Sequence, residues 1–506
     1  MNRDGATESL WQSVPGNKLY ASFSQGQQFD VVIIGAGITG MSTALTLQQA
    51  GKKCIVLEAS NIAFGTSGGT TAHLNTFFDS TYDEVISNFG EDSAKLLATA
   101  GKEAMQIIKD NIAIHKIDCG YGDRTGYVFS VEEKQNKGLE KLVEATQKVG
   151  LPFDFINDSP FPVPYIKIAA IENQAQFHPV EYIIGLANAF VSNGGIIIEN
   201  CRVTGIEENE ILTVQTSLGQ VKAHHAVYAT HIPPGVNILH FRNAPYRSYA
   251  IAVTLKDNKY PQALGYDMCD PYHYYRSQEV NGKQYLIAGG EDHKTGHEEN
   301  TDKCFRNLES YVRKYFDVDS VAYRWSSQYY VPTDGLPYIG HLPGNRENIY
   351  CATGFNGNGM TFGTLSGKIL SDLIVNGENE YKELFNPARV KPIAGFMNFV
   401  KEAADVVGHF IGDKISTEKL NSLADLAAGE AKVVQYEGHT LALYKDENHN
   451  IHAVNSACTH IKCTVGWNSA EKSWDCPCHG SRFSYDGTML TAPARKDLEK
   501  IEVNSE

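Results

Sequence analysis

The sequence predicts a protein of three parts: an α/β domain of the doubly wound, Rossmann-like type, an α+β domain with an antiparallel sheet inserted into it, and a small all-β C-terminal domain. Three observations lead to this prediction. A strand, a glycine-rich turn and a helix begin at Phe29, residues 236–329 alternate in polarity and are rich in Tyr and Val, and short strands with turns begin near Leu420. A chain of 506 residues is long enough for roughly two to four domains.

Composition and charge narrow the class of protein. Hydrophobic residues make up 42% of the chain and charged residues 20%, which is ordinary for a globular protein with sizeable cores. The net charge of −15 argues against nucleic acid or an anionic membrane as the main partner, because both attract clusters of Lys and Arg. No apolar run reaches the roughly 20 residues of a membrane span, and the first 28 residues lack the features of a secretory signal. We therefore expect a cytoplasmic protein.

The first predicted unit is the β-α-β segment over residues 29–58. An apolar strand ends at glycines spaced as G-x-G-x-x-G, and a helix and a second strand ending in an acidic residue follow. The first glycine allows a tight turn, the second lets the backbone approach a pyrophosphate, and the third lets helix and strand pack closely. The acid can bind a ribose hydroxyl and would repel the phosphate of NADP. The predicted cofactor-binding residues here are Gly35, Gly37, Ile38, Thr39, Gly40 and Glu58.

The middle of the chain predicts helices near 92–113 and 134–149, an alternating helix and strand region over 180–235, and antiparallel strands over 236–329. Residues 336–374 then return to strand, glycine-rich turn and helix, so the first domain is expected to be discontinuous. The expected boundaries are an N-terminal tail over 1–28, a cofactor domain over 29–90, 175–235 and 330–385, a substrate domain over 91–174 and 236–329, a linker helix over 386–418 and the all-β domain over 419–506.

The linker segment carries apolar residues at helical spacing between Phe396 and Ile411. It is interpreted as a helix packed on the body of the protein, with an interfacial membrane helix as the alternative, which leaves peripheral membrane contact open.

The two ends of the first domain resemble the FAD-dependent superfamily of D-amino-acid oxidase, glycine oxidase and sarcosine oxidase. The similarity lies in the "DVVIIGAGITGMSTALTL" start and in "IYCATGFNGNGMTFGTLSGKIL" near its end. It implies FAD as the cofactor, a flavin-facing loop over 65–75, and a glycine-rich turn and helix over the flavin. The residues assigned on this basis are Gly65, Thr66, Thr70, Gly354, Gly357, Gly359 and Met360.

The resemblance also implies aromatic and basic side chains over the open face of the flavin. The candidates are Tyr246, Arg247, Tyr249, Tyr272, His273, Tyr274, Tyr275 and Arg276, from which Tyr249, His273, Tyr275 and Arg276 are taken as the catalytic set. An Arg would bind a substrate carboxylate in a bidentate manner. The alternative is that Tyr-rich strands simply suit a half-buried sheet. Residues 289–296 are interpreted as a flavin-proximal loop, and His178 as the start of a helix.

Four cysteines and two histidines lie together near the C-terminal end, in "CTHIKC" and "CPCHGS", whereas the other six cysteines are scattered singly. A zinc site is one interpretation. The pattern closely resembles a Rieske [2Fe-2S] domain, which implies Cys458 and Cys476 as ligands of one iron and His460 and His479 as ligands of the other. The same resemblance implies a disulfide between Cys463 and Cys478 and a hydrogen bond from Ser481 to the cluster.

Two departures from that pattern predict a modest reduction potential. Phe483 stands where high-potential members carry a Tyr, so that one hydrogen bond to a ligand sulfur is lost. Lys462 stands in place of the usual Gly.

The favoured function is an FAD-dependent dehydrogenase that oxidises a small amine or amino acid and passes electrons through the Rieske cluster to an external one-electron acceptor, either a protein or a quinone. An NAD(P)H-driven reductase for a partner oxygenase is the alternative, although no second G-x-G-x-x-G unit is present. A regulatory protein that senses iron or redox state is a third class, and the acidic charge disfavours its binding to DNA.

Overall fold

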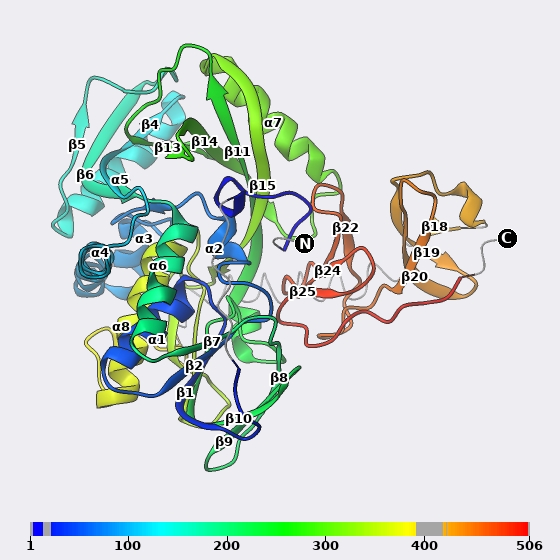
Figure 1. The fold of residues 1–506 in the computed structure, drawn as a ribbon. Coiled ribbons are helices and arrows are strands. Elements are labelled where there is room, and N and C mark those ends of the chain that lie inside the picture. Colours follow the sequence, from blue (N-terminus) through cyan, green and yellow to red (C-terminus); the bar gives the residue numbers. More distant parts are fainter. Residues whose placement is uncertain (1–3, 14–21, 391–417, 421, 504–506) are drawn as a thin grey trace.

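The computed structural model describes residues 4–13, 22–390, 418–420 and 422–503. Two sheets with their helices form the body of the molecule, and two small sheets from the C-terminal part lie at its side (Figure 1). Among the described residues, no helix is long and apolar enough to cross a membrane.

The eight-stranded sheet has a parallel centre, as the β-α-β pattern predicts. Its strands are β1 (Gln28–Ile34), β2 (Cys54–Leu57), β7 (Ile196–Ile198), β8 (Val203–Glu207), β9 (Leu212–Thr216), β10 (Gly219–Tyr228), β16 (Tyr338–His341) and β17 (Ile349–Thr353). Strands β17, β10, β1, β2 and β7 run parallel in that order, and β16 closes one edge in the antiparallel sense. All four residues of β2 are buried, which is typical of a parallel sheet covered on both faces.

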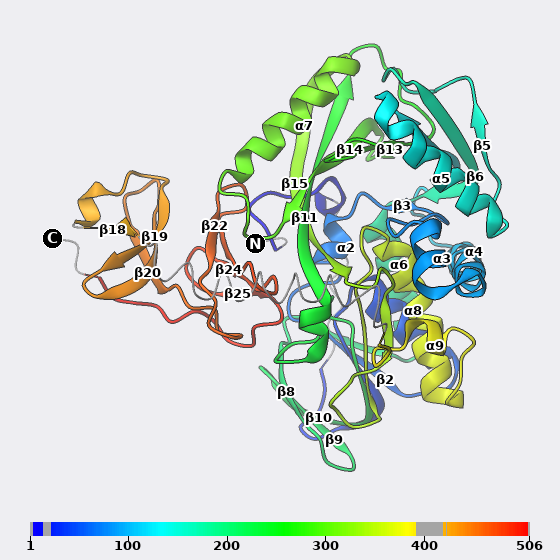
Figure 2. The ribbon, with the colours of Figure 1, turned by 180° about the vertical axis from the view of Figure 1, so that it is seen from behind.

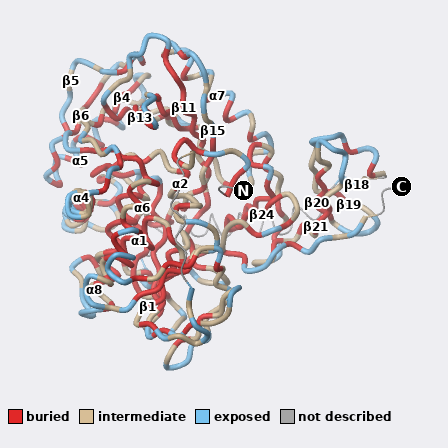
Figure 3. Tube along the Cα trace, in the orientation of Figure 1, coloured by how far each residue is buried: buried red, intermediate tan, exposed pale blue. Residues whose placement is uncertain are grey.

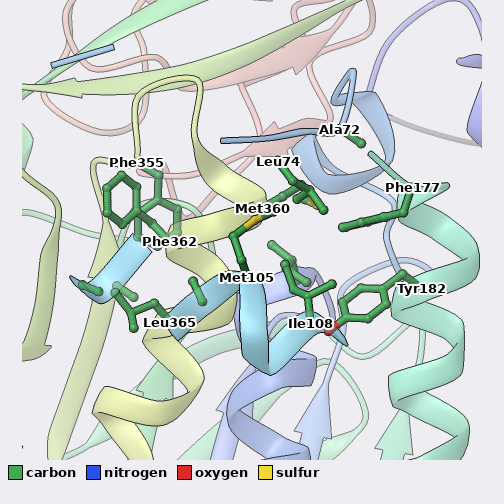
Figure 4. Packing of buried hydrophobic residues seen from close by; sticks show 14 of the residues in the cluster. Ala72, Leu74, Met105, Ile108, Phe177, Tyr182, Phe355, Met360, Phe362 and Leu365 are labelled. Atoms are coloured by element: carbon green, nitrogen blue, oxygen red, sulfur yellow. The ribbon is translucent and has the colours of Figure 1, made fainter. Parts of the chain in front are cut away.

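Helices from distant parts of the chain pack together beside this sheet: α1 (Ile38–Gln49), α4 (Glu91–His115), α6 (Pro179–Ser192) and α8 (Gly359–Asn376). Figure 4 shows Met105 and Ile108 of α4 beside Met360 and Leu365 of α8. The sequence-based boundary at residue 91 assigned α4 to the substrate domain, whereas its apolar face packs on helices of the cofactor domain. Four other short helices are α3 (Tyr82–Phe89), α9 (Lys382–Phe385), η2 (Glu133–Gln135) and η4 (Leu423–Asp425).

The nine-stranded sheet belongs mainly to the segments predicted as the substrate domain. Its path is β15 (Val318–Pro332), β11 (Asn243–Leu255), β14 (Lys283–Lys294), β13 (His273–Val280), β12 (Leu264–Asp267), β4 (Gly122–Ser130), β6 (Lys167–Gln176) and β3 (His73–Leu74), with β5 (Phe153–Ile156) beside β6 and helix α5 (Asn136–Lys148) packed on β4, β5 and β6. Residues 289–296, expected as a loop, mostly belong to strand β14.

A helix was missed within residues 236–329, which were expected to be strands throughout. Helix α7 (Thr301–Tyr315) packs on β11 and β14 (Figure 2). Asn300 caps it by accepting a hydrogen bond from the backbone of Lys303. Its buried Cys304, Leu308 and Val312 recur every four residues, a helical period that the Tyr-rich strands around it obscure.

The C-terminal part is all-β, as expected, and forms two four-stranded sheets. The outer sheet holds β18 (Glu418–Lys419), β19 (Ala431–Tyr436), β20 (His439–Lys445) and β21 (Ile451–Asn455), and the inner sheet holds β22 (Gly466–Asn468), β23 (Ser473–Asp475), β24 (Arg482–Ser484) and β25 (Met489–Thr491). The inner sheet lies against the body and is largely buried, whereas the outer one projects away from it (Figure 3). The predicted linker helix falls on residues 391–417, outside the described residues, and residues 386–390 are not helical.

The segment predicted as an N-terminal tail is packed into the molecule over residues 4–13. Its 3₁₀ turn η1 (Leu10–Ser13) buries Leu10 and Trp11 completely. The indole of Trp11 donates a hydrogen bond to the carbonyl of Thr70, 2.5 Å away, and Asp4 contacts Arg482 of the inner C-terminal sheet at 3.1 Å. We call residues 4–13 the N-terminal strap, because they contact both the cofactor domain and the C-terminal part.

Candidate functional site

A cavity of about 620 Å³ lies between the two large sheets. Residues at the ends of β1, β2 and β10 line one side of it, and residues of β11, β13, β14 and β15 line the other. Its volume is in the range of small-molecule and cofactor sites. The cavity also follows the rule that ligands of open α/β sheets bind at the carboxyl ends of the strands.

The glycines of the first turn are shaped for close approach. Gly35 has φ +107°, and a Cβ atom on Gly40 would lie 1.9 Å from the carbonyl oxygen of Gly35. Gly37 is the N-cap of helix α1 and has no side chain to cap it, and Gly35, Gly37, Ile38 and Thr39 line the cavity, with the N–H of Ile38 donating to Ser67 Oγ. This arrangement fits a pyrophosphate at the start of a helix.

Glu58 follows β2 and lines the same end of the cavity. Its two carboxylate oxygens accept hydrogen bonds from the backbone N–H groups of Ala36 and Ser60, each at 2.8 Å. Burial raises the pKa of Glu58, and these hydrogen bonds oppose that effect. The carboxylate is thus fixed at the place where a ribose hydroxyl is expected.

The other predicted cofactor residues gather along the cavity. Gly65, Thr66 and Thr70 lie around the short helix α2 (Thr66–Gly69), and Gly357, Gly359 and Met360 lie at the start of α8. Ile38 and Thr39 line it too, whereas Gly40 and Gly354 do not. These two glycines serve packing, since a Cβ atom on Gly354 would lie 2.5 Å from Asn243 Oδ1.

The predicted catalytic strands do border the cavity, but the predicted side chains lie elsewhere. The residues that line it include Ser248 of β11, Tyr272 and Tyr274 in and beside β13, Asp292 of β14 and Tyr329 of β15. Tyr249, His273 and Tyr275 belong to the alternate positions and face helix α7. Side chains of a strand alternate with a period of two, so a one-residue error selects the opposite face.

The four side chains of the predicted catalytic set have structural partners instead. Tyr249 is hydrogen-bonded to His293, and His273 lies between Asp267 and Glu291. Tyr275 packs in the core under α7. Arg276 donates to the carbonyls of Thr71, Ala72 and Phe177 and so supports the loop beside the cavity. None of the four lines the cavity, which corrects the prediction that they contact substrate.

The remaining candidates divide in the same way. Arg247 lies 3.6 Å from Asp475 and 4.0 Å from Glu471, both in the C-terminal part, so it joins two domains and binds no substrate carboxylate. Tyr246 packs against Tyr329 with ring centroids 5.9 Å apart. His178 caps helix α6 by accepting from the backbone of Glu181, as its interpretation as a helix start predicts.

Two carboxylates line the end of the cavity that is formed by the nine-stranded sheet, which we call the sheet end. Asp292 Oδ2 accepts from the hydroxyl of Tyr329 at 2.8 Å, while Oδ1 is buried and has no hydrogen-bond partner among the described residues. Burial raises the pKa of Asp292 to about 7, against the opposing effects of Ser248 and Tyr329. Asp79 Oδ2 accepts from the backbone N–H of Gly357 at 2.6 Å. This end of the cavity therefore favours a cation.

His73 is held as a neutral imidazole at the same end. Its Nδ1 lies 2.7 Å from the hydroxyl of Tyr266, which in turn donates to Asn75 Oδ1 at 2.9 Å. These two hydrogen bonds make Nδ1 the donor and leave the lone pair on Nε2, which has no hydrogen-bond partner among the described residues. Burial lowers the pKa of His73 well below its usual range, so the imidazole stays neutral and Nε2 can accept a hydrogen bond.

The four residues of the second predicted site converge on one point of the C-terminal part. Cys458, Cys476 and His479 are almost completely buried, and the rings of His460 and His479 are 5.0 Å apart. Neither imidazole has a hydrogen bond at either nitrogen atom among the described residues, and the pKa of each is lowered by burial. Buried, neutral imidazoles beside two free thiols are what a two-iron cluster with two Cys and two His ligands requires.

The structure also places the residues expected around these four ligands. Cys463 and Cys478 form a disulfide. Ser481 Oγ accepts from the backbone N–H of Ala494 and lies close enough to Cys458 to lower the pKa of that thiol, after the larger effect of Cys476. Phe483 is completely buried in the core of the inner sheet. Lys462 has φ +70°, the left-handed conformation that a Gly at this position adopts without strain.

The two sites adjoin one another. The hydroxyl of Tyr330 donates to the carbonyl of His479 at 3.3 Å, and Tyr330 itself lines the cavity. His460 packs on His240, and His479 packs on Phe241, both in the 3₁₀ turn η3 (Ile238–Arg242) of the body. Residues 489–492, 494 and 495 of the C-terminal part form a section of the cavity wall.

Comparison with known proteins identifies both parts. Residues 30–373 match the family model described as FAD dependent oxidoreductase. The chain belongs to this family. Residues 417–502 match the Rieske [2Fe-2S] domain. The chain is 33% identical over 502 residues to YhfW of Bacillus subtilis (strain 168), a protein named for a Rieske 2Fe-2S iron-sulfur centre. The alignment covers 99% of this chain and 98% of YhfW.

Two further proteins match about three quarters of the chain. Gamma-glutamylputrescine oxidoreductase of Escherichia coli (strain K12) is 28% identical over 399 residues, which are 74% of this chain and 91% of that one. Glycine oxidase from Geobacillus kaustophilus has the same fold, with a TM-score of 0.61 at 17% identity over 72% of this chain and 99% of that one.

The cofactors of this FAD-dependent oxidoreductase are FAD and a Rieske [2Fe-2S] cluster. The close glycine turns and the fixed Glu58 fit the nucleotide half of FAD, and the unpartnered imidazoles of His460 and His479 fit the cluster. Sequence reasoning missed Asp79, His73 and Tyr330 in the cavity wall. Asp79 and Tyr330 stand in runs without a motif, and His73 lies in the predicted flavin-facing loop over 65–75 without having been singled out there; only the fold brings the three together.

Proposed function

We propose that this FAD-dependent oxidoreductase dehydrogenates a small amine or amino acid, and that the electrons pass to its own Rieske cluster and then to an external acceptor, either a protein or a quinone. The names of similar proteins support an amine or amino-acid substrate, since one is named for gamma-glutamylputrescine and another, of the same fold, for glycine. When bound, FAD supplies a two-electron acceptor for hydride, and the cluster supplies a one-electron carrier.

The residues of the chain have three tasks in this reaction. Aromatic side chains line the sheet end of the cavity and exclude water from it: the tyrosines of the nine-stranded sheet together with Phe77, Phe78 and Phe355. Asp292 and Asp79 attract the protonated amine. Asp292, whose pKa burial raises to about 7, accepts a proton from the substrate nitrogen, and His73 Nε2 accepts a hydrogen bond from it, so that the amine lone pair becomes available as hydride leaves the adjacent carbon.

The observation that carries the proposal is the shared wall of the two sites. Tyr330 lines the FAD cavity and its hydroxyl donates to the carbonyl of the cluster ligand His479. The rings of His460 and His479 pack against His240 and Phe241 in η3, so a cluster held by these two histidines would lie with its histidine side toward the flavin domain of the same chain. This placement supports transfer between the two cofactors within one molecule, and thereby a dehydrogenase in preference to an oxidase.

Anaerobic reduction of the purified holoenzyme tests the proposal. Addition of a reactive primary amine should bleach the flavin absorbance and then produce the EPR signal of a reduced Rieske cluster. In His479→Ala the amine should still bleach the flavin while the EPR signal is lost, and His452→Ala, a histidine of the outer sheet, should behave as the unmodified protein. Bleaching by NADH with no response to amines refutes the dehydrogenase, and bleaching by amines without cluster reduction refutes the transfer.

A further inference from the structure

We propose that the sheet end of the cavity is a binding site for an organic ammonium group, built from Asp292 and three tyrosines, and that it selects amines that carry no carboxylate. The proposal rests on the proposed amine dehydrogenase and narrows its substrate class, since amino acids were left open by the sequence and are now disfavoured.

The first step is the state of Asp292. Its Oδ2 is held by the hydroxyl of Tyr329, while its Oδ1 is buried without a hydrogen-bond partner in the described part of the chain. A buried carboxylate oxygen without a partner is costly, so such an atom at a cavity wall indicates a ligand that supplies the missing donor. An ammonium group supplies both N–H donors and the opposite charge.

The second step is what surrounds Asp292. Tyr272, Tyr274 and Tyr329 line the same end of the cavity, and the rings of Tyr272 and Tyr274 are 5.5 Å apart. The charge of Asp292 raises the pKa of all three hydroxyls, after the larger effect of burial for each, which places them in one electrostatic neighbourhood. Aromatic faces beside a carboxylate form the kind of cage that binds organic cations.

The third step is the distribution of cationic side chains. Among the described residues of the cavity wall, the only arginines or lysines are Arg202 and Arg495. Arg202 influences Glu58 at the nucleotide end and donates to the carbonyl of Met489, and Arg495 donates to the carbonyl of Pro234. Arg247 and Arg276, predicted to bind a substrate carboxylate, are engaged outside the cavity wall. A carboxylate at the sheet end would meet Asp292 and Asp79 and no cation.

Three unreactive probes of similar size test the charge preference of the oxidised holoenzyme. These are 2-methylpentan-2-ylammonium, which has N–H donors but no hydrogen on the carbon that bears the nitrogen, pentan-1-ol and pentanoate, and their binding is measured by the perturbation of the flavin absorbance. The ammonium should bind at least tenfold more tightly than the alcohol, and pentanoate should bind no more tightly than the alcohol. Tighter binding of pentanoate overturns the proposal, and this comparison needs only the unmodified protein.

Two variants of neighbouring carboxylates assign the effect to one residue. Asp292→Asn should remove the tenfold advantage of the ammonium and leave the affinity for pentan-1-ol unchanged. Glu291→Gln is the matched control, because Glu291 is the adjacent residue of β14, contacts His273 and lies outside the cavity wall. It should keep the preference, and an unchanged preference in Asp292→Asn overturns the proposal.

The outcome separates this inference from the proposed function. Selective binding of the ammonium probe, together with no flavin bleaching by any amine, supports the site and refutes the dehydrogenase. Flavin bleaching by amino acids at least as efficient as that by simple amines, with no charge preference among the probes, refutes the site and leaves the dehydrogenase standing.

Discussion

The contact between the N-terminal strap and the Rieske domain can be tested through Arg482. The guanidinium of Arg482 is completely buried, and it donates to Asp4 Oδ2 and to Asp475 Oδ1, each at 3.1 Å, and to the carbonyl of Asp4 at 2.7 Å. Removal of one partner of a buried ion pair leaves an uncompensated charge and typically costs about 3–5 kcal/mol. We therefore expect Arg482→Met to destabilise the docked Rieske domain by roughly that amount.

Asp4→Asn is the smaller perturbation, because Arg482 retains Asp475 and the backbone carbonyl of residue 4. Loss of a hydrogen bond to a charged group costs about 1.5–3 kcal/mol. This corresponds to roughly ten- to hundredfold faster opening of the strap, since each 1.4 kcal/mol is about a factor of ten. Hydrogen–deuterium exchange of the amides in residues 4–13 measures that opening. The exposed carboxylate of Asp425 offers a control, and Asp425→Asn should exchange as the unmodified protein does.

The double variant distinguishes a coupled pair from two independent contacts. If Asp4 and Arg482 act on one another, the combined destabilisation falls short of the sum by about 0.5–3 kcal/mol. Additivity within about 0.5 kcal/mol, or unchanged exchange of residues 4–13 in Asp4→Asn, refutes the reasoning.

Three further predictions concern the two domains. Asp267 and Glu291 raise the pKa of His273 to about 9 in spite of burial. The stability that the protonated His273 contributes is therefore present below the usual pKa of about 6.5 and is lost as the pH rises through 9. Thermal unfolding at increasing pH should show this loss, and the variant His273→Gln should not show it. Cys463→Ser should destabilise the Rieske domain by about 3 kcal/mol in chemical unfolding, because the disulfide closes a 15-residue separation, whereas Cys304→Ser should not produce this loss. Gly40→Ala should abolish flavin absorbance, since the added methyl group would lie 1.9 Å from a backbone oxygen; retained flavin would contradict the packing argument.

The sequence was most informative where one short segment carries a complete chemical pattern. The glycine turn after β1, Glu58 and the four cluster ligands are each fixed by local spacing, and the family matches agree with the cofactors inferred from them. The disulfide between Cys463 and Cys478 was likewise implied by the local pattern and is present in the structure.

The substrate side could not be read in this way, because it is assembled from distant strands. Alternation along β13 predicts two faces and gives no indication of which one faces the cavity. His273 and Tyr275 were chosen, whereas Tyr272 and Tyr274 line the wall. The arginines look like carboxylate ligands in the sequence, yet Arg247 is opposite Asp475 and Arg276 supports a loop. Only their partners, which are far away in the chain, decide between the two roles.

The N-terminal strap has a consequence for the order of biosynthesis. Asp4 is separated from Arg482 by 478 residues, so at a synthesis rate of about 5–20 residues per second its partner follows roughly half a minute to one and a half minutes later. During that interval Trp11 can already bind the flavin-side carbonyl of Thr70, while Asp4 awaits a residue that has not been made. The contact between Asp4 and Arg482 can therefore form only after nearly all of the described chain has been made. An affinity tag fused at the amino end would thus affect how the iron–sulfur domain docks on the body of the protein.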